Sequence, residues 1–349
     1  MESALARPVV RVLPSLGLVL VTGGLLLLGW VAYSVLRPLP AAPYRYELQK
    51  EGSSPGSGKL DTRNWPDLRI EKYAMLVDGV DKPVAQMHVA RRGEGGPVMI
   101  DWRNLSEEPM GSLDVSFPEV ASLAQAIDKH TSQKAIVLGW WDTSRQIRLL
   151  TGRVTPFDAY LAEPAITPSF WRAQGRSIDR YEREFWGAVP GVDVQRKFAQ
   201  FADALSADVA TGVARLQELV GGQEAYIAVS VSDIYKLGLM RPQRLGVASR
   251  VFPLQSNIHG DINAVDLWAR QKKYAGYELQ KLSGNAVRAY FLTDARSGDT
   301  LLAHMLPFTT SRPTGLRAVQ LVYQHGDYWV YQIPAVDSTQ EERPHEKAE

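Results

Sequence analysis

The sequence of 349 residues contains no cysteine. A chain without thiols has no c-type haem attachment motif, no thiolate zinc site, no iron–sulfur cluster and no cysteine nucleophile. Several classes of enzyme and electron carrier are therefore excluded.

An excess of charge of one sign is also lacking, because Lys and Arg number 39 and Asp and Glu number 38. No strong electrostatic field therefore indicates a nucleic-acid partner. Histidine is scarce, and no two of the histidines form an HxH, HExxH or HxxxH pair. We expect neither a metal site nor a bound cofactor. The six histidines are His88, His130, His259, His304, His325 and His345.

Known catalytic motifs are missing as well. The glycine-rich segment at residues 91–97 matches neither a GxGxxG fingerprint nor a P-loop, and it is typical of a hairpin. Residues 230–233 follow a predicted strand without a GxSxG elbow, and a helix cap at Ser232 or Asp233 explains them better than a nucleophile. We identify no catalytic residue and favour a protein that is not an enzyme. An exported hydrolase whose active-site residues are dispersed along the sequence remains an alternative.

Charge is absent over one long run, from Val12 to Leu36. Its core from Leu16 to Leu36 would form a helix of roughly 30 Å, the thickness of a bilayer's hydrocarbon core. A cleaved signal peptide has a shorter apolar region, and a buried helix usually keeps a polar face. We therefore favour an uncleaved anchor that contacts the lipid bilayer through residues 13–36.

The orientation of this anchor does not follow from charge, because basic residues stand on both sides of the run. A short N-terminal tail is easily left in the cytoplasm, which would export the large domain. The absence of cysteine also suits an exported protein. We expect a single-pass protein of the bacterial inner membrane with its C-terminal domain in the periplasm.

Five parts are predicted along the chain. They are a tail at 1–12, a transmembrane helix at 13–36, a flexible tether at 37–60, a soluble domain at 61–335 and a disordered tail at 336–349. Pro, Gly and Ser indicate the tether, and a charged, apolar-poor composition indicates the second tail.

Within the soluble domain, strand and helix patterns alternate. Residues 68–102 predict a β-meander, and residues 117–130 predict a helix. A short buried strand at 134–141 precedes a helix that we expect to be opened by an Asp142/Thr143 cap and closed by Gly152. Residues 177–220 are mostly helical, and strands dominate from Tyr277 onward, including residues 300–308. The fold class is α/β, a mixed sheet with flanking helices and strand-rich ends.

Candidate binding residues gather where the strand at 134–141 meets its helix. Trp140, Trp141 and Asp142 stand at the carboxyl end of a strand, where α/β folds place ligands, and Arg145 follows one helical turn later. These four residues are our candidates for contacting a ligand or partner. Alternatively, one Trp is core, the other lies against the helix, Asp142 is an N-cap and Arg145 belongs to a solvated face.

This block is similar to the WWDxG signature of oligosaccharyltransferase catalytic subunits, which recognise the hydroxyl residue of an acceptor sequon. Trp140, Trp141 and Asp142 match the signature, whereas Ser144 stands where that family has Gly. Members of the family bind their lipid donor with many membrane helices and metal-binding acidic loops. A single predicted span therefore makes transferase activity unexpected.

The layout of the whole chain resembles the hydroxylamine oxidation protein HaoB family. The resemblance covers the apolar N-terminal run, the cysteine-free domain and the block from Ala135 to Gly152. Members are membrane-anchored proteins associated with the octahaem hydroxylamine oxidoreductase of ammonia and methane oxidisers. The resemblance implies an accessory role in assembly, anchoring or support of that periplasmic enzyme, with no haem on this chain. The alternative is a glycan- or peptide-binding module derived from the soluble domain of a membrane glycosyltransferase.

Overall fold

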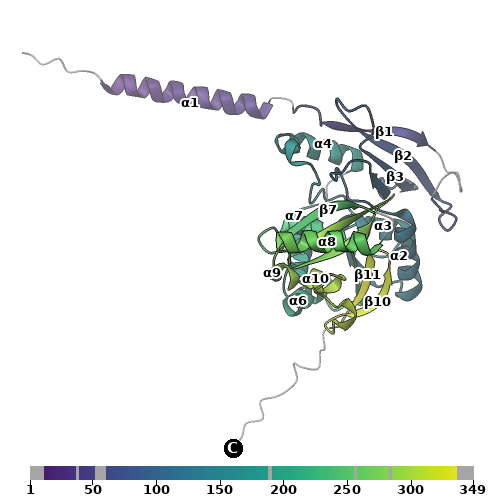
Figure 1. Cartoon of the computed structure of the whole chain (residues 1–349). Coiled ribbons are helices and arrows are strands. Elements are labelled where there is room, and N and C mark those ends of the chain that lie inside the picture. Colours follow the sequence, from purple (N-terminus) through teal and green to yellow (C-terminus); the bar gives the residue numbers. More distant parts are fainter. Residues whose placement is uncertain are drawn as a thin grey trace, which may run out of the picture. The chain divides into compact units, whose positions relative to one another are not determined.

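The computed structural model divides the chain into two compact units, residues 1–41 and 42–349 (Figure 1). The residues that the structure describes are 12–36, 39–51, 60–187, 191–254, 258–282 and 285–335. Except for Val12, the two predicted tails lie outside these residues.

The described part of the first unit contains helix α1 (Val12–Leu36), which confirms a helix over the predicted range. Its large apolar side chains between Leu18 and Tyr33 are exposed. Among the described residues, no helix is long and apolar enough to cross a membrane, so the transmembrane assignment of residues 13–36 is not confirmed.

The second unit opens with an antiparallel sheet whose four strands follow the chain order. These are β1 (Tyr44–Glu51), β2 (Leu68–Val77), β3 (Ala85–Arg92) and β4 (Val98–Asn104). The last three form the predicted meander. Strand β1 lies within residues 37–60, which were predicted to be a flexible tether. That prediction is wrong for residues 44–51, because they pair with β2. Tyr44 and Tyr46 alternate with charged residues, which places both rings on one face of the strand.

A mixed sheet of four strands forms the centre of this unit, in the order β10-β11-β6-β5. The strands are β5 (Ile136–Gly139), β6 (Ala225–Ser230), β10 (Gln320–His325) and β11 (Tyr328–Ile333). Only the pair β5 and β6 is parallel among these neighbours, and Gly139 stands opposite Ala228. The predicted α/β class with a mixed sheet and flanking helices is confirmed.

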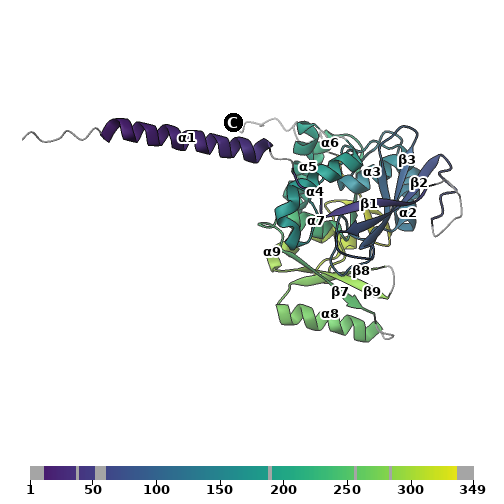
Figure 2. The same cartoon turned by 90° about the horizontal axis from the view of Figure 1, so that it is seen from above.

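The third sheet is antiparallel and has the order β7-β9-β8. Its strands are β7 (Val247–Pro253), β8 (Gly276–Lys281) and β9 (Ala286–Leu292), and helix α8 (Ile258–Lys272) lies along them (Figure 2). Val265 and Ala269 of the helix pack against Ala289 and Phe291 of the sheet.

Helices cover both faces of the central sheet. In β6, Ile227 and Val229 face one apolar core and Tyr226 and Ala228 face another, because successive side chains of a strand point in opposite directions. The first core is completed by α5, α6 and α10, and the second by α2 and α3. The helices of this unit besides α8 are α2 (Phe117–His130), α3 (Trp141–Thr151), α4 (Gly175–Trp186), α5 (Val192–Leu205), α6 (Val209–Val220), α7 (Asp233–Met240), α9 (Ala295–Gly298) and α10 (Leu301–Met305), with 3-10 turns η1 (Ser169–Gln174) and η2 (Pro313–Gly315).

Two local predictions are corrected. Helix α3 begins earlier than predicted, at Trp141, so its N-cap is Trp140 and not Asp142 or Thr143. The predicted strand at 300–308 is the short helix α10, whose cap Thr300 accepts a hydrogen bond from the Ala303 amide. The predicted end of α3 at Gly152 is confirmed, with φ 73°.

Candidate functional site

The candidate site lies at the edge where the parallel strands β5 and β6 end. Because parallel strands bring their carboxyl ends to the same edge, the residues that follow the two strands come together. Trp140, Trp141 and Asp142 follow β5, and Asp233 and Lys236 lie on α7, just after β6. Residues almost a hundred positions apart in the chain therefore meet.

A buried ion triad joins these two segments. The Lys236 Nζ atom lies 2.7 Å from Asp142 Oδ2 and 3.1 Å from Asp233 Oδ1. The other oxygen of Asp233 accepts a hydrogen bond from the Ser230 amide at 2.8 Å. This lysine clamps the start of α3 to α7.

The charges of the triad follow from its surroundings. Burial raises the pKa of Asp233, and the Asp142 charge adds to that rise while Lys236 opposes it. Burial lowers the pKa of Lys236, but the two carboxylates outweigh this and leave it above its ordinary value. Lys236 therefore stays protonated near neutral pH and is no general base for the neighbouring Ser232.

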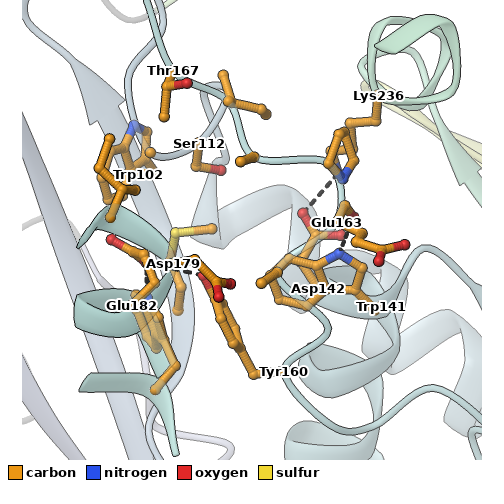
Figure 3. A pocket seen from close by; sticks show the side chains of 18 of the residues that line it. Trp102, Ser112, Trp141, Asp142, Tyr160, Glu163, Thr167, Asp179, Glu182 and Lys236 are labelled. Atoms are coloured by element: carbon orange, nitrogen blue, oxygen red, sulfur yellow. Dashed lines mark hydrogen bonds and ion pairs between the residues drawn. The ribbon is translucent and has the colours of Figure 1, made fainter. Parts of the chain in front are cut away.

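Next to the triad lies a cavity of about 100 Å³, here named the aromatic pocket. Figure 3 shows Trp102 and Glu182 on one side of its open space and Trp141, Asp142 and Lys236 on the other. The first sheet, the loop before α4, α4 itself and the start of α3 all contribute to it. Its aromatic walls are Tyr44, Tyr46, Trp102, Trp140, Trp141, Tyr160 and Trp186.

All four residues singled out from the sequence line the aromatic pocket. Trp140 is 1% exposed and packs edge-on against Phe198, and its Nε1 has no hydrogen-bond partner among the described residues. Trp141 is half-buried; its Nε1 donates to the Glu163 carbonyl oxygen at 2.5 Å. Asp142 borders the pocket while paired with Lys236. Their role in binding stays a prediction.

Arg145 departs from the solvated helix face offered as an alternative, because it is only 8% exposed. Its Nη2 donates to the Pro97 carbonyl oxygen at 2.6 Å, and its guanidinium lies 5.8 Å from the centre of the Tyr160 ring. Burial lowers the pKa of Arg145 to about 10, with the neighbouring Tyr160 and Asp142 opposing the shift. The side chain still carries its charge at neutral pH.

The sequence prediction missed Glu182, the central acid of the aromatic pocket. Its two oxygens accept hydrogen bonds from Tyr44, from Tyr46 at 2.7 Å, from Tyr160 at 3.0 Å and from the Trp186 indole at 2.6 Å. Burial raises its pKa, and the four donors oppose that rise. One signal was available: Ile178, Glu182 and Trp186 recur at four-residue spacing, which places the acid on the apolar stripe of α4.

A second cavity, here named the polar pocket, also borders Asp142 and Lys236 and holds about 570 Å³. Asp142, Lys236 and Trp102 border both pockets. Burial, together with the nearby Glu119, raises the pKa of Asp327 in this pocket to about 7. Within the part of the chain that the structure describes, no group of His, Asp and Glu side chains could hold a metal ion.

Comparisons with known proteins point to one family. The family model described as HaoA-associated protein HaoB matches residues 9–333 of this chain. No curated protein matches. Among solved structures, the C-terminal domain of PglB from C. jejuni aligns with 61% of this chain and 99% of its own, at 12% identity and a TM-score of 0.35. Values this low carry no argument.

Proposed function

Because the chain belongs to the HaoA-associated protein HaoB family, we propose that it is an accessory protein of a hydroxylamine oxidoreductase. The observation that carries this proposal is the family match over almost the whole chain. The protein assists the assembly, anchoring or support of the oxidoreductase in the periplasm and is no electron carrier itself. This role requires a protein partner and asks for no catalytic residue on this chain.

Attachment to a membrane is the second part of this proposal. Helix α1 exposes four consecutive leucines, Leu25 to Leu28, each at least 64% exposed. Consecutive residues of a helix point about 100° apart, so these side chains surround the axis on all sides. Exposed apolar surface of this extent is stabilised by an apolar environment. A bilayer supplies that environment and would keep the second unit near a membrane-bound complex.

Co-purification tests the association. The tagged full chain is extracted from its native membranes in mild detergent at low salt, and the haem absorbance and oxidoreductase polypeptide are measured in the eluate. We expect both to be enriched over an unrelated tagged membrane protein. Clean separation of the two proteins at low salt would contradict the proposal.

A version with Leu25 to Leu28 replaced by serine serves as the matched control. It separates direct association from residence in the same membrane, because the second unit is unchanged in it. We expect this variant to retain the oxidoreductase when the two purified proteins are mixed in detergent-free buffer.

A second candidate function, a glycan- or peptide-binding module, is favoured by one observation. Trp141 and Asp142 border a cavity with aromatic walls, as binding of a ring or a side chain would require. Thermal-shift measurements against sets of glycans and short peptides test this function. If the chain is such a module, at least one compound should raise the melting temperature, and this effect should be lost in Trp141→Ala. The absence of any stabilising compound would count against this function.

A further inference from the structure

Glu182 is a buried carboxylate whose hydrogen-bonding capacity is fully used. Its Oε1 accepts from the hydroxyls of Tyr44 and Tyr46, and its Oε2 accepts from Tyr160 and Trp186. An ionised carboxylate has about four lone-pair sites, whereas a protonated one must donate a hydrogen bond itself. Four donors directed at two oxygens therefore match the ionised form.

No positive charge of the described residues balances this carboxylate. Glu182 takes part in no ion pair there, and the two cations that line the aromatic pocket are engaged elsewhere. Lys236 is held between two aspartates, and Arg145 donates to the Pro97 carbonyl. Besides Glu182, the pocket is lined by the carboxylates of Asp142, Glu163 and Asp179. Asp142 pairs with Lys236 and Asp179 pairs with Arg183, each at 2.7 Å. Among the described residues, Glu182 and Glu163 are therefore the lining carboxylates outside any ion pair.

The walls of the pocket add a second attraction for positive charge. Seven aromatic side chains border the cavity, and the face of an aromatic ring attracts a cation. One cation already uses this attraction, because the Arg145 guanidinium lies 5.8 Å from the centre of the Tyr160 ring. Aromatic walls combined with buried negative charge are the chemistry that recognises alkylammonium groups.

We propose that the aromatic pocket binds an organic cation, an alkylammonium group that belongs either to a small free ammonium compound or to the lysine side chain of a partner. The proposal rests on the pocket being a ligand site, as in the second candidate function, and is independent of association with the oxidoreductase. In place of an unspecified glycan or peptide, the proposed ligand must carry a positive charge. The cation sits among the rings and balances Glu182.

Calorimetric titration of the full chain in detergent with choline tests the charge requirement. The control ligand is 3,3-dimethylbutan-1-ol, which has the same shape without the charge. We expect choline to bind about tenfold more tightly or better. Equal affinity for the two compounds, or no binding of choline at millimolar concentration, would overturn the proposal. N-acetyl-lysine methylamide is titrated in parallel. Tighter binding of this compound would indicate a lysine side chain as the ligand, and tighter binding of choline would indicate a small free ammonium compound.

Two variants locate the binding site. Trp141→Ala removes a half-buried wall of the pocket, and Trp268→Ala is its matched control, a half-buried Trp of α8 that also contacts cations. We expect choline affinity to fall about tenfold in the first and to be unchanged in the second. Glu182→Gln should weaken choline and leave the neutral compound unaffected. Equal losses in both Trp variants would overturn the assignment, and this comparison holds even where Glu182→Gln fails to fold.

Discussion

Lys236 is the residue that allows two aspartates to share one buried edge of the central sheet. Its side chain is 6% exposed, and the paired carboxylates of Asp142 and Asp233 are 11% and 1% exposed. Removing one partner of a buried ion pair leaves an uncompensated charge, which costs more than the pair contributes. Here two such charges would remain, and they would repel each other.

We therefore expect Lys236→Met to lower the free energy of unfolding by about 3–5 kcal/mol, measured by urea denaturation at pH 7. Arg196→Met is the control, because it breaks an ion pair with Asp193 whose side chains are 64% and 81% exposed. An exposed pair contributes little, so this change should stay within about 0.5 kcal/mol. Similar effects of the two substitutions would argue against a buried triad.

Asp327 makes stability depend on pH, because its pKa is raised to about 7 by burial and by Glu119. The folded chain holds this proton more tightly than the unfolded chain, where the pKa is near 3.9. The contribution of Asp327 to stability is thus complete below about pH 4 and is lost as the pH rises through 7. We expect the free energy of unfolding to fall between pH 5 and 8, with up to about 1.4 kcal/mol per pH unit from this group.

Asp327→Asn tests this contribution, because an amide oxygen still accepts the hydrogen bond from Gln280. Denaturation between pH 5 and 8 should show a shallower decline in the variant. Burial also raises the pKa of Glu278 to about 7, so this residue should preserve part of the pH dependence of stability in the variant. Asp193→Asn removes an exposed carboxylate and should leave the slope as in the parent. An unchanged slope in Asp327→Asn would refute the assignment.

At the scale of elements, α4 is fastened to β1 through one acid. Glu182 of the helix accepts hydrogen bonds from the hydroxyls of Tyr44 and Tyr46 of the strand. The Tyr46 N–H also donates to the Tyr181 hydroxyl oxygen of the helix at 2.6 Å. The strand thus forms a wall of the aromatic pocket. In Figure 1, α4 lies beside the strands of the first sheet.

The end of α3 offers a test of helix geometry. Gly152 has φ 73°, a left-handed conformation that costs any other residue about 1 kcal/mol, and a Cβ atom there would meet nothing within 4 Å. We expect Gly152→Ala to destabilise the chain by about 1 kcal/mol in thermal or urea denaturation. Gly260→Ala in α8 is the matched control and should stabilise by about 0.5–1 kcal/mol, because its site is also open and right-handed. Changes of the same sign would contradict this account.

Some helices and strands were predicted correctly from sequence patterns, and others were not. The helix α2 carries a clear apolar stripe, and the Asp78-Gly79 turn marks the meander. The segment at 300–308 is mostly apolar, so its pattern does not separate a strand from a helix. Four of the five residues of α10 are buried, which explains why no amphipathic pattern marked it as a helix. Strand β7 was missed because its residues are half-buried on both faces and show no alternation.

At the scale of the whole molecule, the two compact units differ in what they contain. The second unit holds the three sheets and both pockets, whereas the first holds α1 with its exposed leucines. Attachment through α1 would make the location of the protein depend on the first unit alone.

We expect the full chain to sediment with membranes, and the variant with serine at Leu25 to Leu28 to shift to the soluble fraction. The physical reason is the loss of about 1.5–3 kcal/mol of burial free energy for each leucine. Fractionation followed by immunoblotting measures the distribution. Val192→Ser, which removes an apolar side chain that is 79% exposed in the second unit, is the control and should stay with the membranes. The same distribution for all three proteins would rule out attachment through α1.

The sequence by itself determined the α/β class, the helix over residues 13–36 and the gathering of Trp140, Trp141, Asp142 and Arg145, because these depend on local patterns. Only the tertiary structure decided what surrounds them. Lys236 and Glu182 reach the site from α7 and α4, and β1 closes it from a segment that composition had indicated as a tether. Partners so distant in the chain meet only through strand pairing and core packing, which no local pattern encodes.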